Sequence, residues 1–276
     1  MLPAARGFAG EAAHGFNLRE AFGNSRRACN PGAMEYACAM RTHAHSAGAV
    51  SSGEKRRTFA VNATEQIPIG SVTLMGDLQI PQDAAGLVLF AHGSGSSRHS
   101  PRNQAVARAL RGAGSGTLLF DLLTRDEESV DDRTGHLRFD IPFLADRLAA
   151  ATRWVTSHTE AQHLPIGYFG ASTGGAAALV AAAELGTEVK AVVSRGGRPD
   201  LAGDALPLVK APTLLIVGGY DGEVLRLNED AYEQLLCEKK IEVVPRATHL
   251  FEEPGALEEV ARLAAAWFQQ HFGTQP

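Results

Sequence analysis

A serine flanked by glycines is the clearest candidate nucleophile in the sequence. The segment Gly170-Ala-Ser-Thr-Gly-Gly175 follows an apolar run that begins at Leu164 and precedes an alanine-rich stretch. This order predicts a strand, a tight turn and a helix. A serine hydroxyl is a weak nucleophile at neutral pH, so it needs an adjacent base and N–H groups that stabilise an oxyanion. The turn would expose the hydroxyl of Ser172, and Thr173 would offer its backbone N–H to the oxyanion.

The acid and the base that such a serine requires follow it in the chain. Asp221 ends an apolar run that begins at Thr213, and His249 comes after a second run that begins at Ile241. Because side chains at the carboxyl ends of parallel strands meet in one crevice, we expect Ser172, Asp221 and His249 to form a catalytic triad. Glu223 is a rival for the acid, but it lies two residues further from the end of the predicted strand.

A glycine- and serine-rich segment supplies a candidate for the second oxyanion donor. It runs from His92 to Ser97 and follows the apolar run Leu87-Val-Leu-Phe-Ala91. A loop after an early strand is where serine hydrolases of this kind place their second N–H donor. Ser94 is our first candidate, with Gly93 and Gly95 as alternatives. We expect His92 to be a structural histidine that bonds the backbone of this loop.

The same segment imitates a dinucleotide-binding fingerprint. Two glycines precede Arg98, and Asp121 ends the next predicted strand. However, Arg98 stands where the third glycine is needed for close helix packing, and Ser100-Pro101 delays the start of the helix. The sequence therefore disfavours a nucleotide site, and we expect no cofactor.

Two arginines are candidates for binding an acidic group of the substrate. Arg98 and Arg195 follow predicted strands on the side of the sheet that would carry the triad. A guanidinium group matches a carboxylate in shape and charge. The alternative is that both side chains are solvated, as most loop arginines are.

Composition narrows the class of protein. The chain has 276 residues, of which 45% are hydrophobic and 21% charged, and its formal net charge is −5. Such a chain has no basic field for binding nucleic acid or an anionic membrane. Three cysteines are too few for a disulfide framework, and His43-x-His45 lacks a third metal ligand. No apolar stretch approaches 18 residues, so we expect a cytoplasmic protein without a transmembrane helix.

The chain divides into two parts by pattern. Residues 1–55 show neither strand nor helix periodicity, which predicts a disordered N-terminal extension. From residue 56 to 276, apolar runs alternate with helical stretches, which is typical of a mostly parallel sheet with helices on both faces. We expect the acidic segment 122–140 to be a solvated loop, and 195–212 is too short for a helical cap domain.

These motifs together carry a resemblance. With Gly-Ala-Ser-Thr-Gly-Gly, Gly-Gly-Tyr-Asp221 and Ala-Thr-His249-Leu-Phe in this order, and His92-Gly-Ser-Gly before them, residues 56–272 resemble the α/β-hydrolase superfamily, specifically its dienelactone-hydrolase-like branch. They are similar to hydrolase modules that occur fused to phosphoribosyltransferases. The resemblance implies an α/β-hydrolase fold of about eight strands, and it assigns the triad to Ser172, Asp221 and His249. Dienelactone hydrolases proper have a cysteine at the position of Ser172, which favours a general serine esterase here.

The expected activity is hydrolysis of a small-molecule ester with a short acyl group through an acyl-enzyme intermediate. Two alternatives remain open on the sequence. A thioesterase or an acyltransferase could use the same triad. A protein of this fold could also bind a ligand without hydrolysing it, since fold alone does not fix function.

Overall fold

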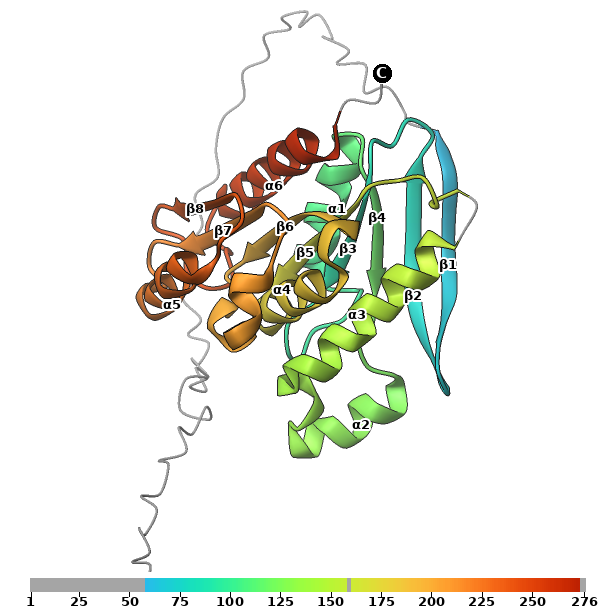
Figure 1. The fold of residues 1–276 in the computed structure, drawn as a ribbon, viewed down its shortest axis with the longest axis horizontal. Coiled ribbons are helices and arrows are strands. Elements are labelled where there is room, and N and C mark those ends of the chain that lie inside the picture. Colours follow the sequence, from blue (N-terminus) through green and yellow to red (C-terminus); the bar gives the residue numbers. More distant parts are fainter. Residues whose placement is uncertain (1–57, 158–159, 274–276) are drawn as a thin grey trace, which may run out of the picture. The chain divides into compact units, whose positions relative to one another are not determined.

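An eight-stranded sheet runs through the part of the chain that the computed structural model describes, residues 58–157 and 160–273 (Figure 1). The predicted N-terminal extension, with Cys29, Cys38 and the two histidines His43 and His45, lies outside these described residues. The strands are β1 (Phe59–Ile69), β2 (Val72–Pro81), β3 (Leu87–Ala91), β4 (Gly116–Phe120), β5 (Ile166–Ala171), β6 (Val189–Arg195), β7 (Thr213–Gly218) and β8 (Lys239–Val244).

The strands lie in the order β1-β2-β4-β3-β5-β6-β7-β8. β2 pairs antiparallel with both β1 and β4, and every pair from β4 to β8 is parallel. The mostly parallel sheet predicted from the sequence is confirmed. The first strand extends to Ile69 and forms a long hairpin with β2, which turns at Gly70 and Ser71.

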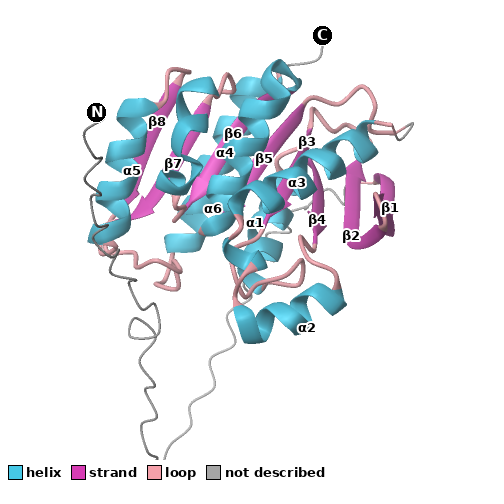
Figure 2. Cartoon of the chain, turned by 60° about the horizontal axis from the view of Figure 1, so that its bottom comes forward, coloured by secondary structure: helices cyan, strands magenta, loops and turns pink. Residues whose placement is uncertain are grey.

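Helices cover both faces of the sheet (Figures 1 and 2). α1 and α6 pack on one face, and α3, α4 and α5 pack on the other. The helices are α1 (Pro101–Gly112), α2 (Arg125–Thr134), α3 (Ile141–Thr156), α4 (Thr173–Leu185), α5 (Gly222–Gln234) and α6 (Ala256–Phe272), with short 3₁₀ helices η2 (Leu137–Phe139), η3 (Gly186–Glu188) and η4 (Pro199–Leu208).

The two cores follow from the alternation of side chains along the strands. In β3, Leu87 and Leu89 belong to the core on the α3 and α4 face, whereas Val88 and Phe90 belong to the core on the α1 and α6 face. A strand buried on both faces is apolar throughout, which is why these runs stood out in the sequence. Each such side chain contributes about 1.5–3 kcal/mol when fully buried.

The segment between β4 and α3 differs from its predicted form. Instead of a solvated loop it contains α2, which lies apart from the sheet on the side where β4 ends (Figures 1 and 2). A capping box starts this helix: the Glu127 N–H donates to the Thr124 hydroxyl at 3.2 Å, and the Thr124 N–H donates to the Glu127 carboxylate at 2.8 Å. Gly135, at φ 64°, ends it. The prediction of a loop was wrong because high acidity obscured this capping signal.

Between β6 and β7 the chain contains only η4, so nothing there forms a cap domain over the sheet. Within the described ranges, none of the helices is both long and apolar enough to cross a lipid bilayer.

The packing of α6 on the sheet predicts a sharp effect at Gly167. A Cβ on Gly167 would lie 2.7 Å from Cε1 of Phe268 and 2.8 Å from Cζ of Phe272. Because both rings are buried in the core, we expect Gly167→Ala to lower the free energy of unfolding by about 1–3 kcal/mol. Gly112→Ala is the matched control, since no atom lies within 4 Å of its Cβ position. It should leave stability unchanged or raise it by up to about 1 kcal/mol. Urea unfolding measures the free energy of unfolding of both variants. Equal effects of the two substitutions would contradict the close packing of α6 on the sheet at Gly167.

Candidate active site

Ser172 lies at the sharp turn between β5 and α4, as the sequence predicted. Its backbone has φ 52° and ψ −123°, a conformation that costs a non-glycine residue on the order of 1–3 kcal/mol. Backbone hydrogen bonds hold Ser172 in this conformation. The Ser172 N–H donates to the carbonyl of Arg195 at 3.4 Å, and the Ser172 carbonyl accepts from the N–H groups of Gly175 at 2.9 Å and Arg198 at 3.1 Å.

The glycines around this serine are required by close backbone contacts. A Cβ on Gly170 would lie 2.4 Å from the carbonyl oxygen of Gly174, and a Cβ on Gly174 would lie 2.1 Å from the carbonyl oxygen of Ala91. Backbone atoms cannot move aside as a flexible side chain can. The start of α4 therefore packs directly on β5 and on the end of β3, and this packing lifts Ser172 out of the line of the strand.

His249 and Asp221 contact each other directly. The Nδ1 atom of His249 lies 2.7 Å from Oδ2 of Asp221, and Asp221 is the more buried of the two side chains. The acceptor role of a carboxylate places the proton on Nδ1 and leaves Nε2 free to accept one. Glu223, the rival acid, is exposed in the first turn of α5 and makes no hydrogen bond to His249 among the described residues.

The loops that carry this pair are joined through their backbones. The N–H of Tyr220 donates to the carbonyl of Ala247 at 2.9 Å, and the N–H of Gly219 donates to the carbonyl of Val244 at 2.9 Å. The loop after β7 is thus joined to the loop after β8. Because these bonds involve the residues just before Asp221 and His249, they fix the separation of the two side chains.

Gly196 lies next to His249 and directly follows the residue that bonds Ser172. It directly follows Arg195, whose carbonyl accepts the N–H of Ser172. A Cβ on Gly196 would lie 3.1 Å from the carbonyl oxygen of His249 and 3.6 Å from its Nδ1 atom. The short backbone segment Arg195-Gly196 is therefore next to both Ser172 and His249. Gly196 was not among the residues predicted from the sequence, although the pair Gly196-Gly197 after a strand is a signal of close backbone approach.

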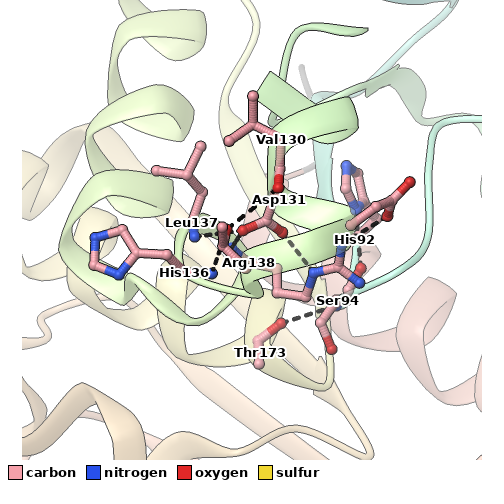
Figure 3. A network of polar contacts seen from close by, with 11 residues as sticks. His92, Ser94, Val130, Asp131, His136, Leu137, Arg138 and Thr173 are labelled. Carbon is pink, nitrogen blue, oxygen red and sulfur yellow. Dashed lines mark hydrogen bonds and ion pairs between the residues drawn. The ribbon is translucent and has the colours of Figure 1, made fainter. Parts of the chain in front are cut away.

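The two residues predicted to stabilise an oxyanion are in contact. The backbone N–H of Ser94 donates to Oγ1 of Thr173 at 3.0 Å (Figure 3). Thr173 is the first residue of α4, so its own N–H lies at a helix N-terminus, where the helix dipole favours negative charge. Gly93 adjoins the serine, since a Cβ on it would lie 3.0 Å from Cβ of Ser172.

His92 has the structural role expected from the sequence. Its Nε2 atom accepts the N–H of Leu122 at 3.0 Å, and its Nδ1 atom lies 3.0 Å from the carbonyl of Gly93. This arrangement requires the neutral ring with its proton on Nδ1. Burial lowers the pKa of His92, although the Gly93 carbonyl and Asp121 oppose that shift. His92 thus joins the Ser94 loop to the end of β4 only while it is uncharged.

Arg98 is held by carboxylates of the protein itself. Its guanidinium forms an ion pair with Asp121 and lies 3.5 Å from Asp77, and its backbone N–H donates to Asp121 at 2.8 Å. These contacts balance its charge and connect the Ser94 loop to β2 and to the end of β4. They favour a structural role over contact with a substrate.

Arg195 is in the opposite situation. Its side chain is buried against the ring of Phe251, and its Nε and Nη1 atoms have no hydrogen-bond partner among the described residues. Burial, with a smaller effect of Arg102, lowers the pKa of Arg195 to about 10, so the group is still protonated at neutral pH. Contact of Arg195 with an acidic substrate stays a prediction.

A cavity of about 30 Å³ adjoins the contact between Ser94 and Thr173. Its lining includes His92, Leu144 and Arg138, the last of which the sequence analysis missed. Figure 3 shows Arg138 reaching from the segment after α2 toward Ser94 and His92. Because a cavity needs about 10–15 Å³ of such space to hold one water, this one suits only a small group.

Comparisons with known proteins show the family and the fold of the chain. Residues 79–272 match the sequence model of the Dienelactone hydrolase family. The chain is similar to a dienelactone hydrolase from Anabaena variabilis, with 62% identity and a TM-score of 0.75, over 76% of this chain and 98% of the other. It also resembles Est1E from Butyrivibrio proteoclasticus, with 17% identity and a TM-score of 0.65, over 76% of this chain and 99% of the other. The second likeness concerns the fold alone.

Two curated relatives are longer proteins. The putative phosphoribosyl transferases of two Mycobacterium tuberculosis strains are each 57% identical to this chain over 206 residues, which is 75% of this chain and 46% of theirs. The chain therefore spans about half the length of the curated relatives that it matches.

The partly buried position of His92 predicts a pH dependence of stability. Its pKa is below 6.5 in the folded protein and near 6.5 in the unfolded chain, so the unfolded chain binds more protons as the pH falls below about 6.5. Stability is thus lost on acidification through that range. We expect the free energy of unfolding to fall less between pH 7.5 and 5.5 in His92→Gln, whose side chain does not titrate, than in the wild type. Exposed His99→Gln is the control and should follow the wild type; an unchanged slope in His92→Gln would contradict the assignment.

Proposed function

The chain belongs to the dienelactone hydrolase family of α/β-hydrolases, and on this premise we propose that it is a serine hydrolase of carboxylic esters. The observation that carries the proposal is the contact between His249 and Asp221 beside the strained turn at Ser172. A histidine oriented by an acid, near a serine at a strand-to-helix turn, is the arrangement that activates a hydroxyl for attack on a carbonyl. We assign Ser172 as nucleophile, His249 as base and Asp221 as the orienting acid.

In the first half of the reaction, Nε2 of His249 takes the proton of the Ser172 hydroxyl while Oγ attacks the ester carbonyl carbon. The carbonyl oxygen becomes an oxyanion, and the imidazolium that forms is stabilised by the carboxylate of Asp221. Collapse of the tetrahedral intermediate breaks the bond to the alcohol oxygen. His249 returns the proton to that oxygen, which leaves an acyl group on Ser172.

In the second half, water replaces the alcohol. His249 takes a proton from the water as it attacks the acyl carbon. When the second tetrahedral intermediate collapses, the bond to Oγ of Ser172 breaks and His249 returns the proton to that oxygen, which releases the carboxylic acid and restores the free serine hydroxyl. The same base and the same oxyanion donors serve both halves, so the site needs no further reactant.

The N–H groups of Thr173 and Ser94 are the proposed oxyanion donors. Thr173 follows the nucleophile at the N-terminus of α4, where the N–H groups of the first turn have no partner within the helix. The N–H of Ser94 bonds the Thr173 hydroxyl, so it would exchange this partner for the oxyanion or share itself between the two. Removing a donor of this kind costs on the order of 10²- to 10³-fold in rate in other enzymes.

The small cavity supports a preference for short acyl groups. It has room for about one small group beyond the oxyanion donors, and the absence of a cap between β6 and β7 leaves the site without a large apolar cover. The name of the curated relatives refers to proteins about twice as long as the matched region. Our proposal rests on the motifs inside that region and includes no phosphoribosyl transfer.

Kinetics of triad variants test the proposal. We expect Ser172→Ala and His249→Ala each to lower kcat for a 4-nitrophenyl ester of a short acid by roughly 10⁴- to 10⁶-fold, and the double variant to cost little more, because the residues act as a unit. Asp221→Asn should lose on the order of 10⁴-fold, by analogy with the serine proteases.

Exposed Ser71→Ala and His163→Ala are matched controls and should retain the wild-type rate. Near wild-type ester hydrolysis by Ser172→Ala would refute the proposed function.

A further inference from the structure

Arg138 lines the cavity beside the proposed oxyanion donors and takes no part in the triad. Two carboxylates hold its guanidinium in place: Nε donates to Asp131 at 2.5 Å, and Nη2 donates to Asp132 at 2.8 Å. Asp131 is itself fully buried and accepts the N–H of Leu137 at 2.6 Å. Burial raises the pKa of Asp131, but the hydrogen bonds from Arg138 and Leu137 outweigh that effect and keep the carboxylate ionised. The orientation of the guanidinium is therefore set before any substrate binds.

The third nitrogen of this guanidinium faces the glycine- and serine-rich loop. Nη1 of Arg138 lies 3.8 Å from the position that a Cβ would take on Gly95. No hydrogen bond joins Nη1 to another of the described residues. Gly95 has φ 68° and no side chain, so the space beside Nη1 remains open. Figure 3 shows the guanidinium directed toward Ser94, whose backbone is a proposed oxyanion donor.

The charges around the cavity decide which partner Nη1 can take. Asp131 and Asp132 already balance Arg138, and Arg98 pairs with Asp121. Glu128 also lines the cavity and adds a negative charge. An anionic group entering here would therefore meet no unbalanced cation and would be repelled by Glu128. An alkyl group would cover Nη1 without replacing its hydrogen bond to water, which is unfavourable. An uncharged oxygen acceptor satisfies Nη1 and adds no charge.

We propose that Arg138 is a specificity-determining residue whose Nη1 donates a hydrogen bond to an uncharged oxygen of the substrate, such as an ether, hydroxyl or carbonyl oxygen, next to the scissile ester. Asp131 is the positioning residue that fixes this donor. The inference rests on the proposed hydrolysis of esters at Ser172. Hydrogen bonds to charged groups change a rate or an affinity by about ten- to a hundredfold, and that is the selectivity we expect.

Pairs of esters that differ by one oxygen in place of one methylene test the proposal. On the acyl side the pairs are 4-nitrophenyl methoxyacetate with butanoate and 4-nitrophenyl 3-methoxypropanoate with pentanoate. On the alcohol side the pair is 2-methoxyethyl acetate with butyl acetate. The measured quantity is kcat/KM for the oxygen-bearing ester divided by kcat/KM for the alkyl ester of the same pair. This ratio is then divided by the ratio of the rates at which the same two esters undergo alkaline hydrolysis.

We expect the wild type to prefer the oxygen-bearing ester in at least one pair, and Arg138→Met to lower that ratio about tenfold or more. The alkyl member of the pair should change little. Exposed Arg133→Met is the matched control on α2 and should keep the wild-type ratio. Arg138→Lys retains the charge beside Asp131 but lacks Nη1, so it should also lose the preference for the oxygen-bearing ester. This variant keeps the test decisive if Arg138→Met does not fold.

Two results would overturn the proposal. One is an unchanged ratio in both Arg138 variants for every pair. The other is a larger loss of kcat/KM in the Arg138 variants for 4-nitrophenyl hemisuccinate than for the uncharged esters. That result would mean that the subsite binds anions. Ser172→Ala, measured alongside, separates this failure from failure of the proposed function. If that variant is inactive while the ratios do not move, only the role of Arg138 is wrong.

Discussion

The close packing of the start of α4 on the ends of β3 and β5 is the constraint on which the candidate site depends. Gly170 and Gly174 are the points of contact, and no residue with a Cβ fits at either without displacing backbone atoms. This packing places Ser172 in a strained conformation, which the bonds from Arg195, Gly175 and Arg198 maintain. Ser172, the proposed nucleophile, is thus positioned by the backbone of the neighbouring strands, of α4 and of the loop after β6. Its placement does not depend on the packing of its own side chain.

The remaining groups of the site are positioned by links between loops. His92 bonds the backbone on both sides of its ring, and Arg98 connects the same loop to β2 and to the end of β4. Backbone hydrogen bonds join the loops that carry Asp221 and His249. A buried ion pair contributes little net stability, but it strongly disfavours arrangements in which a partner is missing. The partly buried pairs at Arg98 and Arg138 therefore disfavour loop arrangements in which either arginine loses its carboxylates.

Much of the fold and the main polar pair could be predicted from the sequence, because strands buried on both faces read as apolar runs and their carboxyl ends meet at one edge. That logic placed Asp221 with His249, in preference to Glu223. It failed for residues 122–140. There, acidic composition suggested solvent, yet Asp131 is fully buried by pairing with Arg138 seven positions later. Periodicity does not reveal such a pair. The same limit applies to Arg98, whose carboxylate partners come from β2 and from the end of β4 and are not neighbours in the chain.

Covalent labelling tests the central claim, that Ser172 is an activated nucleophile, most directly. A fluorophosphonate reacts with a serine only where a base removes the hydroxyl proton and an oxyanion site accepts the phosphonyl oxygen. The labelled protein is digested, and mass spectrometry identifies the modified peptide. We predict a single adduct on Ser172 in the wild type, strongly reduced labelling in His249→Ala, and none in Ser172→Ala. An adduct on another serine, or no reaction in a folded wild-type protein, would contradict this account.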